Sequence, residues 1–288
     1  MRIILLLLSF LFFISACERV PDTEVTEKLF NTFSVSDSAV LHIDNLNGSV
    51  TINGWEQDHV ELTAIKKAPT EELLNEIEIV ITQTEEFRIE THYPRKSRTN
   101  MAVAYTLFVP KNLHIAKIEM KNGVIEIHDA RGDAELKSTN GSISVSDFEG
   151  KIEAVNTNGS ILIDNVIGTV SARNTNGNIR LSDIDNLQFA HTTNGKLFAD
   201  VNYLNEMMKL TNSNGAITLY LPKRIDATLK ARCSNGVVKV ENLDLIGERA
   251  TYYEIEGYLG RRTHLVSVST ANGKIEIIGK NEQIDNDE

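Results

Sequence analysis

Cysteine is nearly absent from this chain, because only Cys17 and Cys233 occur in 288 residues. Cys17 ends an apolar N-terminal run and is expected to be modified, as described below. Only one other cysteine remains, so no internal disulfide is available. Cys233 falls at a position that alternation places inside the protein. We interpret it as a small buried residue and not as a nucleophile.

Motifs that carry chemistry are also missing. The seven histidines are scattered, and there is no His-x-x-x-His, Cys-x-x-Cys, Gly-x-Ser-x-Gly or phosphate-binding loop. The sequence therefore predicts no cofactor, no metal and no enzyme activity.

Positive charge is scarce. Lys and Arg number 29 against 40 Asp and Glu, for a net charge of −11. Loss of residues 1–16 would remove only Arg2, giving −11 − 1 = −12. An acidic surface disfavours nucleic acid and anionic lipid headgroups as partners.

What the chain does have is a recurrent Asn-Gly pair. Five pairs follow one another at intervals of 18 residues, and later intervals are 20, 21 and 37. The pairs begin at Asn122, Asn140, Asn158, Asn176, Asn194, Asn214, Asn235 and Asn272. A fixed short period is typical of a solenoid, in which each repeat stacks on its neighbours.

The residues around each pair alternate as in a strand with one buried face. Positions three and five after the Asn are apolar, as in Ile143 and Val145, and the residue between them is mostly polar. A second corner is expected at Asp129, Asp147, Asn165 and Asp183. The sequence thus predicts an all-β fold, a single-stranded β-helix or β-solenoid with about 18–21 residues per coil. The number of faces stays open.

Two polar columns need an explanation. Two residues before the corner Asn, alternation points Asn156, Asn174 and Asn212 inward, and we expect their amides to bond to copies in the coils above and below. We assign the corner asparagines to the same structural role; a row of ligand contacts is the alternative for the inward column. The second-corner Asx residues are interpreted as caps of their own turns, with a calcium site as the alternative.

The N-terminus, MRIILLLLSFLFFISAC, has one basic residue, an apolar run and small residues, which is typical of a secretory signal. Ile14-Ser15-Ala16-Cys17 resembles the lipobox of bacterial lipoproteins, which implies acylation of Cys17 and a membrane anchor. Glu18 resembles the residue that follows the cysteine in Gram-negative outer-membrane lipoproteins. We therefore divide the chain into a signal peptide (1–16), a lipidated N-terminus and tether (17–37), a solenoid (38–279) and a disordered acidic tail (280–288).

Three further motifs occur in a fixed order. They are Gly48-x-Val50-x-Ile52-x-Gly54-Trp55, then Tyr105-x-Leu107-x-Val109-Pro110, then serial [Ser/Thr]-Asn-Gly-x-Ile-x-Ile rungs. In this order they resemble the DUF4097 family, a relative of the head GIN domain, over residues 38–279. The resemblance implies a β-helical, adhesin-like protein, and it carries no catalytic residues to transfer.

Function is expected where the chain leaves the regular rungs. The candidate contact residues are Tyr252, Tyr253, Tyr258, Arg261 and Arg262, together with Arg95, Lys96 and Arg98 of a basic loop. The sequence favours a non-catalytic, lipid-anchored envelope protein that binds an unidentified protein or glycan. The alternatives are a polysaccharide-acting β-helix enzyme and an accessory role in envelope-stress signalling.

Overall fold

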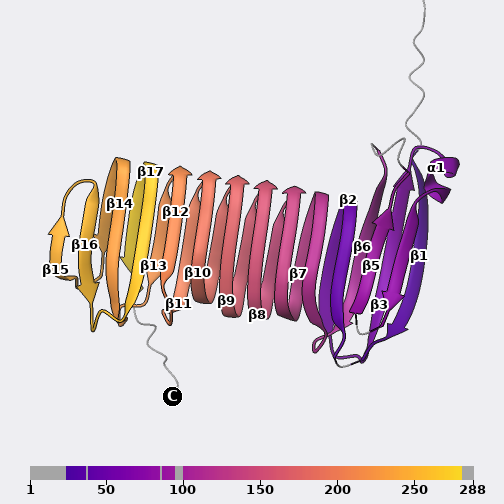
Figure 1. Ribbon diagram of the computed structural model, residues 1–288, viewed down its shortest axis with the longest axis horizontal. Helices are drawn as coiled ribbons and strands as arrows, with labels where there is room; N and C mark the ends of the chain where they lie inside the picture. Colours follow the sequence, from indigo (N-terminus) through magenta and orange to yellow (C-terminus); the bar gives the residue numbers. More distant parts are fainter. Residues whose placement is uncertain (1–23, 37, 85, 95–99, 281–288) are drawn as a thin grey trace, which may run out of the picture.

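The computed structural model describes residues 24–280, apart from residues 37, 85 and 95–99. This part of the chain is a rod of stacked β-coils with a short helix at one end (Figure 1). The predicted β-solenoid is therefore confirmed. The N-terminal elements are β1 (Val25–Ser34), β2 (Val40–Trp55), β3 (His59–Ala68), α1 (Glu71–Asn75), β4 (Glu78–Gln83), β5 (Glu86–His92) and β6 (Ala102–Pro110). The middle of the rod contains β7 (His114–Asn140), β8 (Ile143–Asn158), β9 (Ile161–Asn176), β10 (Ile179–Asn194), β11 (Leu197–Tyr203), β12 (Met208–Asn214) and β13 (Ile217–Leu221). The last elements are β14 (Ala227–Glu241), β15 (Ile246–Ala250), β16 (Glu254–Leu259) and β17 (His264–Gly279).

The central coils lie in parallel register, one repeat apart. Ile143 of β8 pairs with Ile125 of β7 and with Ile161 of β9. Because the register equals the repeat, each apolar position covers the same position of the next coil. Ile143, Val145 and Ile161 are at most 1% exposed, so the core extends along the rod as a set of aliphatic columns.

The Asn-Gly corner needs glycine for two reasons. At Gly159 φ is +129°, which side-chain-bearing residues rarely adopt, and an added Cβ would lie 2.0 Å from the carbonyl oxygen of Gly141. Only a residue without a Cβ lets successive corners approach this closely. The second corner is built by non-glycine residues in the left-handed region, with φ between +50° and +54°; Asx side chains tolerate this conformation best. These residues are Asp129, Asp147, Asn165 and Asp183.

At the C-terminal end the coils do not follow one another in chain order. β17 is the last strand in the chain, but it pairs in parallel with β12 and β13 on one side and with β14 on the other. The chain reaches this place through an antiparallel hairpin, β15–β16, which pairs with β14. The inserted coil is also the more deeply buried one: Ile275 and Ile277 are fully buried, whereas Val240 of β14 is only partly buried.

The N-terminal end is closed in a similar way. β2 lies between β7 and the pair β5 and β6, and β1 and β3 add antiparallel strands. β1 falls within the segment that we assigned to a tether, which is a correction: alternate residues such as Leu29 and Phe33 are half-buried against the sheet, and the Phe33 ring lies 5.1 Å from that of Phe87. Antiparallel strands thus cover both ends of the parallel stack and protect its edges. No helix within the described ranges is long and apolar enough to cross a membrane.

Candidate functional site

The inward polar column does not form the predicted amide-to-amide ladder. The Nδ2 atoms of Asn156, Asn174 and Asn212 donate to the main-chain oxygens of Gly141, Gly159 and Gly195, at 2.7, 2.7 and 2.8 Å. Thr192 uses its hydroxyl in the same way on Gly177 O. The reason is that positive-φ glycine corners present a carbonyl to the interior, and a donor one coil on satisfies it. The inward column therefore stabilises the Asn-Gly corners by hydrogen bonds to their main-chain oxygens.

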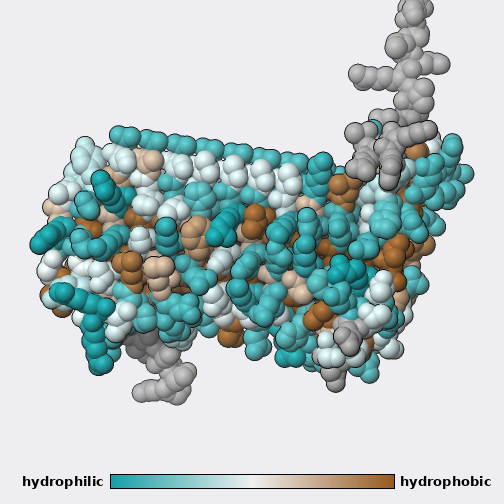
Figure 2. Space-filling model, viewed as in Figure 1, coloured by the Kyte–Doolittle hydropathy of each residue, from teal (hydrophilic) through white to brown (hydrophobic). Residues whose placement is uncertain are grey.

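The amide ladder lies instead at the corner itself. Eight hydrogen bonds of 2.6–2.9 Å, each from an Nδ2 to the Oδ1 of the neighbouring coil, join nine asparagines. In spatial order they are Asn47, Asn122, Asn140, Asn158, Asn176, Asn194, Asn214, Asn272 and Asn235. Figure 2 shows a straight row of hydrophilic residues along the edge where β8, β9 and β10 end. With strands about 4.8 Å apart, eight steps make this edge roughly 40 Å long.

The candidate tyrosines and arginines lie in or beside the β15–β16 hairpin at one end of the rod, which we call the tip (Figure 1). Tyr252 and Tyr253 occupy the turn, 65% and 52% exposed, with their rings edge to face at 5.1 Å. Their main-chain oxygens accept from Val238 N and Cys233 N of β14. Two large exposed rings are thus held on a backbone that is itself anchored.

The opposite side of the hairpin forms a small pocket of ≈ 280 Å³, the tip pocket. It is lined by Thr228, Gly247, Arg249, Glu256, Gly257, Tyr258 and Arg262. The guanidinium carbon of Arg262 lies 3.4 Å from the Tyr258 ring centroid, a cation–π contact. Arg262 also has a φ of +63°, uncommon for a residue of its size.

The charge of the tip pocket is positive. Arg249 and Arg262 line it, and its one carboxylate, Glu256, is paired with Lys230 at 2.8 Å. The hydrogen bond from Lys230 lowers the pKa of Glu256, so this carboxylate stays charged at neutral pH. Sequence reasoning missed Arg249, because only the antiparallel register of β15 and β16 brings it opposite Glu256.

The basic loop was expected to work together with the excursion that contains this hairpin. Arg95, Lys96 and Arg98 lie outside the described residues, but β5 and β6, which flank them in the chain, are at the end of the rod opposite the tip (Figure 1). Cys17 is likewise outside the described part of the chain. The structure brings Tyr252 together with Tyr253, and Tyr258 together with Arg262, on different sides of the hairpin, while Arg261 is exposed in the turn after β16.

Trp55 and Cys233 are packed into the structure and do not form a binding or reactive site. The Trp55 ring packs against His59 and Phe108, and its Nε1 donates to His59 O at 2.9 Å. Cys233 is 2% exposed, and burial raises the pKa of its thiol, which disfavours the reactive thiolate. Among the described residues, no group of three or more His, Cys, Asp or Glu side chains is placed to hold a metal ion.

Comparison with known proteins identifies the family. The model of the family described as Toastrack DUF4097 matches residues 39–278. The chain belongs to the Toastrack DUF4097 family. No curated protein matches the chain.

Solved structures similar to this Toastrack chain include a "putative cell adhesion protein" from Clostridium sporogenes, which is 16% identical, with 89% of this chain and 100% of the other covered and a TM-score of 0.27. A "putative adhesin" from Bacteroides fragilis is 10% identical, with coverages of 87% and 97% and a TM-score of 0.36. Another from Parabacteroides merdae is 10% identical, with coverages of 87% and 96% and a TM-score of 0.40. The family assignment rests on the family model alone.

Proposed function

We propose that this chain is a non-catalytic binding protein of the bacterial cell envelope, anchored by a lipid on Cys17, which presents the tip to a protein or glycan ligand. The observation that carries the proposal is that the N-terminal strand and the tip lie at opposite ends of the rod. β1, the first described strand, lies at one end, and the exposed tyrosines and the tip pocket lie at the other (Figure 1). A lipid attached before β1 would therefore hold the tip away from the membrane.

The chemistry of the tip favours a ligand with an anionic group. Two arginines line a pocket whose carboxylate is already paired, on a chain whose net charge is −11. Arginine binds carboxylate and phosphate groups through paired N–H donors. On the other side of the same hairpin, the exposed Tyr252 and Tyr253 offer apolar area at low entropic cost.

The anchor is tested by replacing Cys17 with serine. Serine cannot receive the thioether-linked diacylglycerol, and lipid chains supply the membrane affinity that we assign to this protein. We expect the variant to shift from the membrane fraction to the soluble fraction in cell fractionation and to lose labelling by radioactive palmitate. If Cys17→Ser sedimented with membranes at wild-type levels, the lipid anchor would be wrong.

The tip is tested by Arg262→Asn. Asparagine tolerates positive φ, so the backbone is preserved while the guanidinium is removed. With the fluorescently labelled chain 18–288 titrated onto intact cells, we expect saturable binding that weakens at least tenfold in the variant. Tenfold corresponds to about 1.4 kcal/mol, just below the roughly 1.5–3 kcal/mol of a hydrogen bond to a charged group.

Arg180→Asn is the matched control, because Arg180 also stacks on an aromatic ring, at 4.4 Å from Phe198, but lies in the middle of the rod. Its binding should equal that of the wild type. Equal losses in both variants would contradict a site at the tip. Release of products from cell-wall glycan by the wild-type chain would contradict the non-catalytic role.

A further inference from the structure

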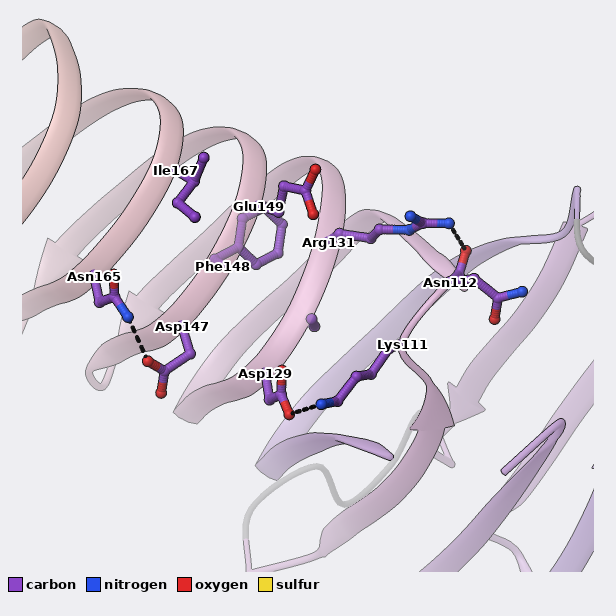
Figure 3. A pocket seen from close by; sticks show the side chains of 10 residues that line it. Lys111, Asn112, Asp129, Arg131, Asp147, Phe148, Glu149, Asn165 and Ile167 are labelled. Atoms are coloured by element: carbon purple, nitrogen blue, oxygen red, sulfur yellow. Dashed lines mark hydrogen bonds and ion pairs between the residues drawn. The ribbon is translucent and has the colours of Figure 1, made fainter. Parts of the chain in front are cut away.

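A second hollow lies far from the tip, where the second corners of three successive coils meet the turn between β6 and β7. We call it the corner groove (Figure 3); its volume is ≈ 380 Å³. It is lined by Lys111, Asn112, Asp129, Ala130, Arg131, Asp147, Phe148, Glu149, Asn165 and Ile167. The corner groove shares no residue with the tip pocket. Its volume lies at the lower end of the range of roughly 300–1,000 Å³ for small-molecule sites.

One rim of the corner groove consists of the left-handed Asx residues. Lys111 Nζ lies 2.7 Å from Asp129 Oδ2, and Asn165 Nδ2 donates to Asp147 Oδ1 at 2.7 Å (Figure 3). Each carboxylate is thus held by one neighbour and keeps further lone pairs for a ligand. The rim offers fixed acceptors one coil apart.

The other rim comes from the next outward position of the same coils. Arg131, Glu149 and Ile167 are in register on β7, β8 and β9. Arg131 Nη2 donates to the Asn112 main-chain oxygen at 3.3 Å, whereas its Nε is buried without a hydrogen-bond partner. An orphaned buried donor costs free energy, and a small rotation of the guanidinium toward a ligand oxygen would relieve it.

The hollow exists because one coil carries a small side chain at the inward corner position. Ala130 occupies this position where the following coils have Phe148 and Val166. Two coils away on β9, Ile167 also lines the groove and is 63% exposed, which is high for a large aliphatic side chain. The corner groove therefore combines polar rims with an apolar surface.

We propose that the corner groove binds an uncharged oligosaccharide lying along the rod axis. Sugars present hydroxyl groups, which donate and accept, around C–H faces, which pack on aliphatic carbon, and the groove offers partners for both. Two cations and three carboxylates line it, so their charges nearly cancel and an ionic ligand gains little. Corners spaced at about 4.8 Å repeat on the scale of one sugar ring.

A peptide fits the corner groove less well. Extended peptides usually bind by adding a strand to free main-chain donors and acceptors. Here the main chain of Ala130, Phe148 and Val166 is already paired from coil to coil. The ligand must therefore be recognised by side chains, and side chains are the usual partners of saccharide hydroxyl groups.

The test is isothermal titration calorimetry of the chain 18–288, which contains every described residue, with three probes. Chitotetraose and maltotetraose are uncharged, and tetragalacturonate is anionic. We expect one uncharged probe to bind saturably and Ile167→Ser and Glu149→Gln to weaken it at least tenfold. Leu162→Ser is the matched control, because Leu162 is also an exposed aliphatic residue on β9 but lies outside the groove; its affinity should equal that of the wild type.

Unchanged melting temperatures for Ile167→Ser and Leu162→Ser would establish that both variants are folded. The proposal is overturned if neither uncharged probe binds, if tetragalacturonate binds more tightly than both, or if Leu162→Ser loses affinity as Ile167→Ser does. Arg262→Asn should bind the uncharged probe like the wild type. A loss of saccharide binding in that variant would mean that the measured binding heat comes from the tip, and it would overturn the corner groove as the site.

Discussion

Replacing Gly177 with alanine is expected to lower the free energy of unfolding by about 3–5 kcal/mol. The new Cβ would lie 2.0 Å from Gly159 O at a φ of +137°, and strain of this kind costs about 1–3 kcal/mol. Relief of the clash moves a corner whose N–H donates to Asn194 O and whose oxygen accepts from Thr192, and each of these hydrogen bonds contributes about 0.5–1.5 kcal/mol.

Chemical denaturation followed by circular dichroism measures this change. Gly257→Ala is the control, because Gly257 has no positive φ and its nearest neighbour would be the Leu245 side chain at 3.2 Å. It should cost less than about 1 kcal/mol. If both variants unfolded at the same denaturant concentration, close packing of the Asn-Gly corners would not be what requires glycine there.

The regular part of the fold was predictable because one physical constraint recurs in every coil. A corner that approaches its neighbour closely needs glycine, and glycine after asparagine at an interval of 18 residues is visible without a structure. The alternation around Ile143 and Val145 then assigns the buried face. Each of these signals is visible within one repeat or between successive repeats, so the sequence reports it directly.

The ends of the rod could not be predicted in the same way. Both β14 and β17 contain an Asn-Gly corner with flanking apolar residues, and a repeat pattern does not say which coil lies inside. That order is set by pairing between strands far apart in the chain, such as β12 with β17. β1 was missed because Val25, Leu29 and Phe33 are only half-buried and precede the first motif.

The hydrogen-bond partners of the two asparagine columns could be predicted only in part from the sequence. Alternation correctly placed Asn156 and Asn174 inside, at 2% exposure each. It could not show that each amide faces a glycine carbonyl instead of its own copy, since that depends on the direction in which the corner peptide points. The outer ladder forms because Asn140, Asn158 and Asn176 occupy the same register position in successive coils, a property of the repeat as a whole.

The candidate sites also contain some features that the sequence shows and others that require the structure. Tyrosine and arginine content marked the excursion that contains the tip, because such residues outside a regular repeat are visible in the sequence. The pairing of Arg249 with Glu256 and the corner groove both need the register between strands. In the groove, the informative residue is the small Ala130, and a missing side chain gives no sequence signal until its neighbours are known.

The aliphatic columns make a second large effect expected, from Ile161→Ala. Ile161 is fully buried in the middle of the rod, stacked between Ile143 and Ile179. Truncation removes buried area and leaves a cavity that both neighbouring coils border, for a cost of about 2–5 kcal/mol. The adjacent Leu162 points outward at 41% exposure, so Leu162→Ala should change stability by no more than about 0.5 kcal/mol.

The two variants differ by one position on one strand, so their location along the rod is matched. In a stacked array, stability is a sum of coil and interface contributions, and a weak coil can open before the rest. Native-state hydrogen exchange should therefore show faster exchange in β8, β9 and β10 for Ile161→Ala than in β2 or β17. Equal losses of stability for Ile161→Ala and Leu162→Ala would mean that the inward columns do not hold the coils together. Uniformly faster exchange over all seventeen strands of the described residues would mean that the rod unfolds as one cooperative unit instead of coil by coil.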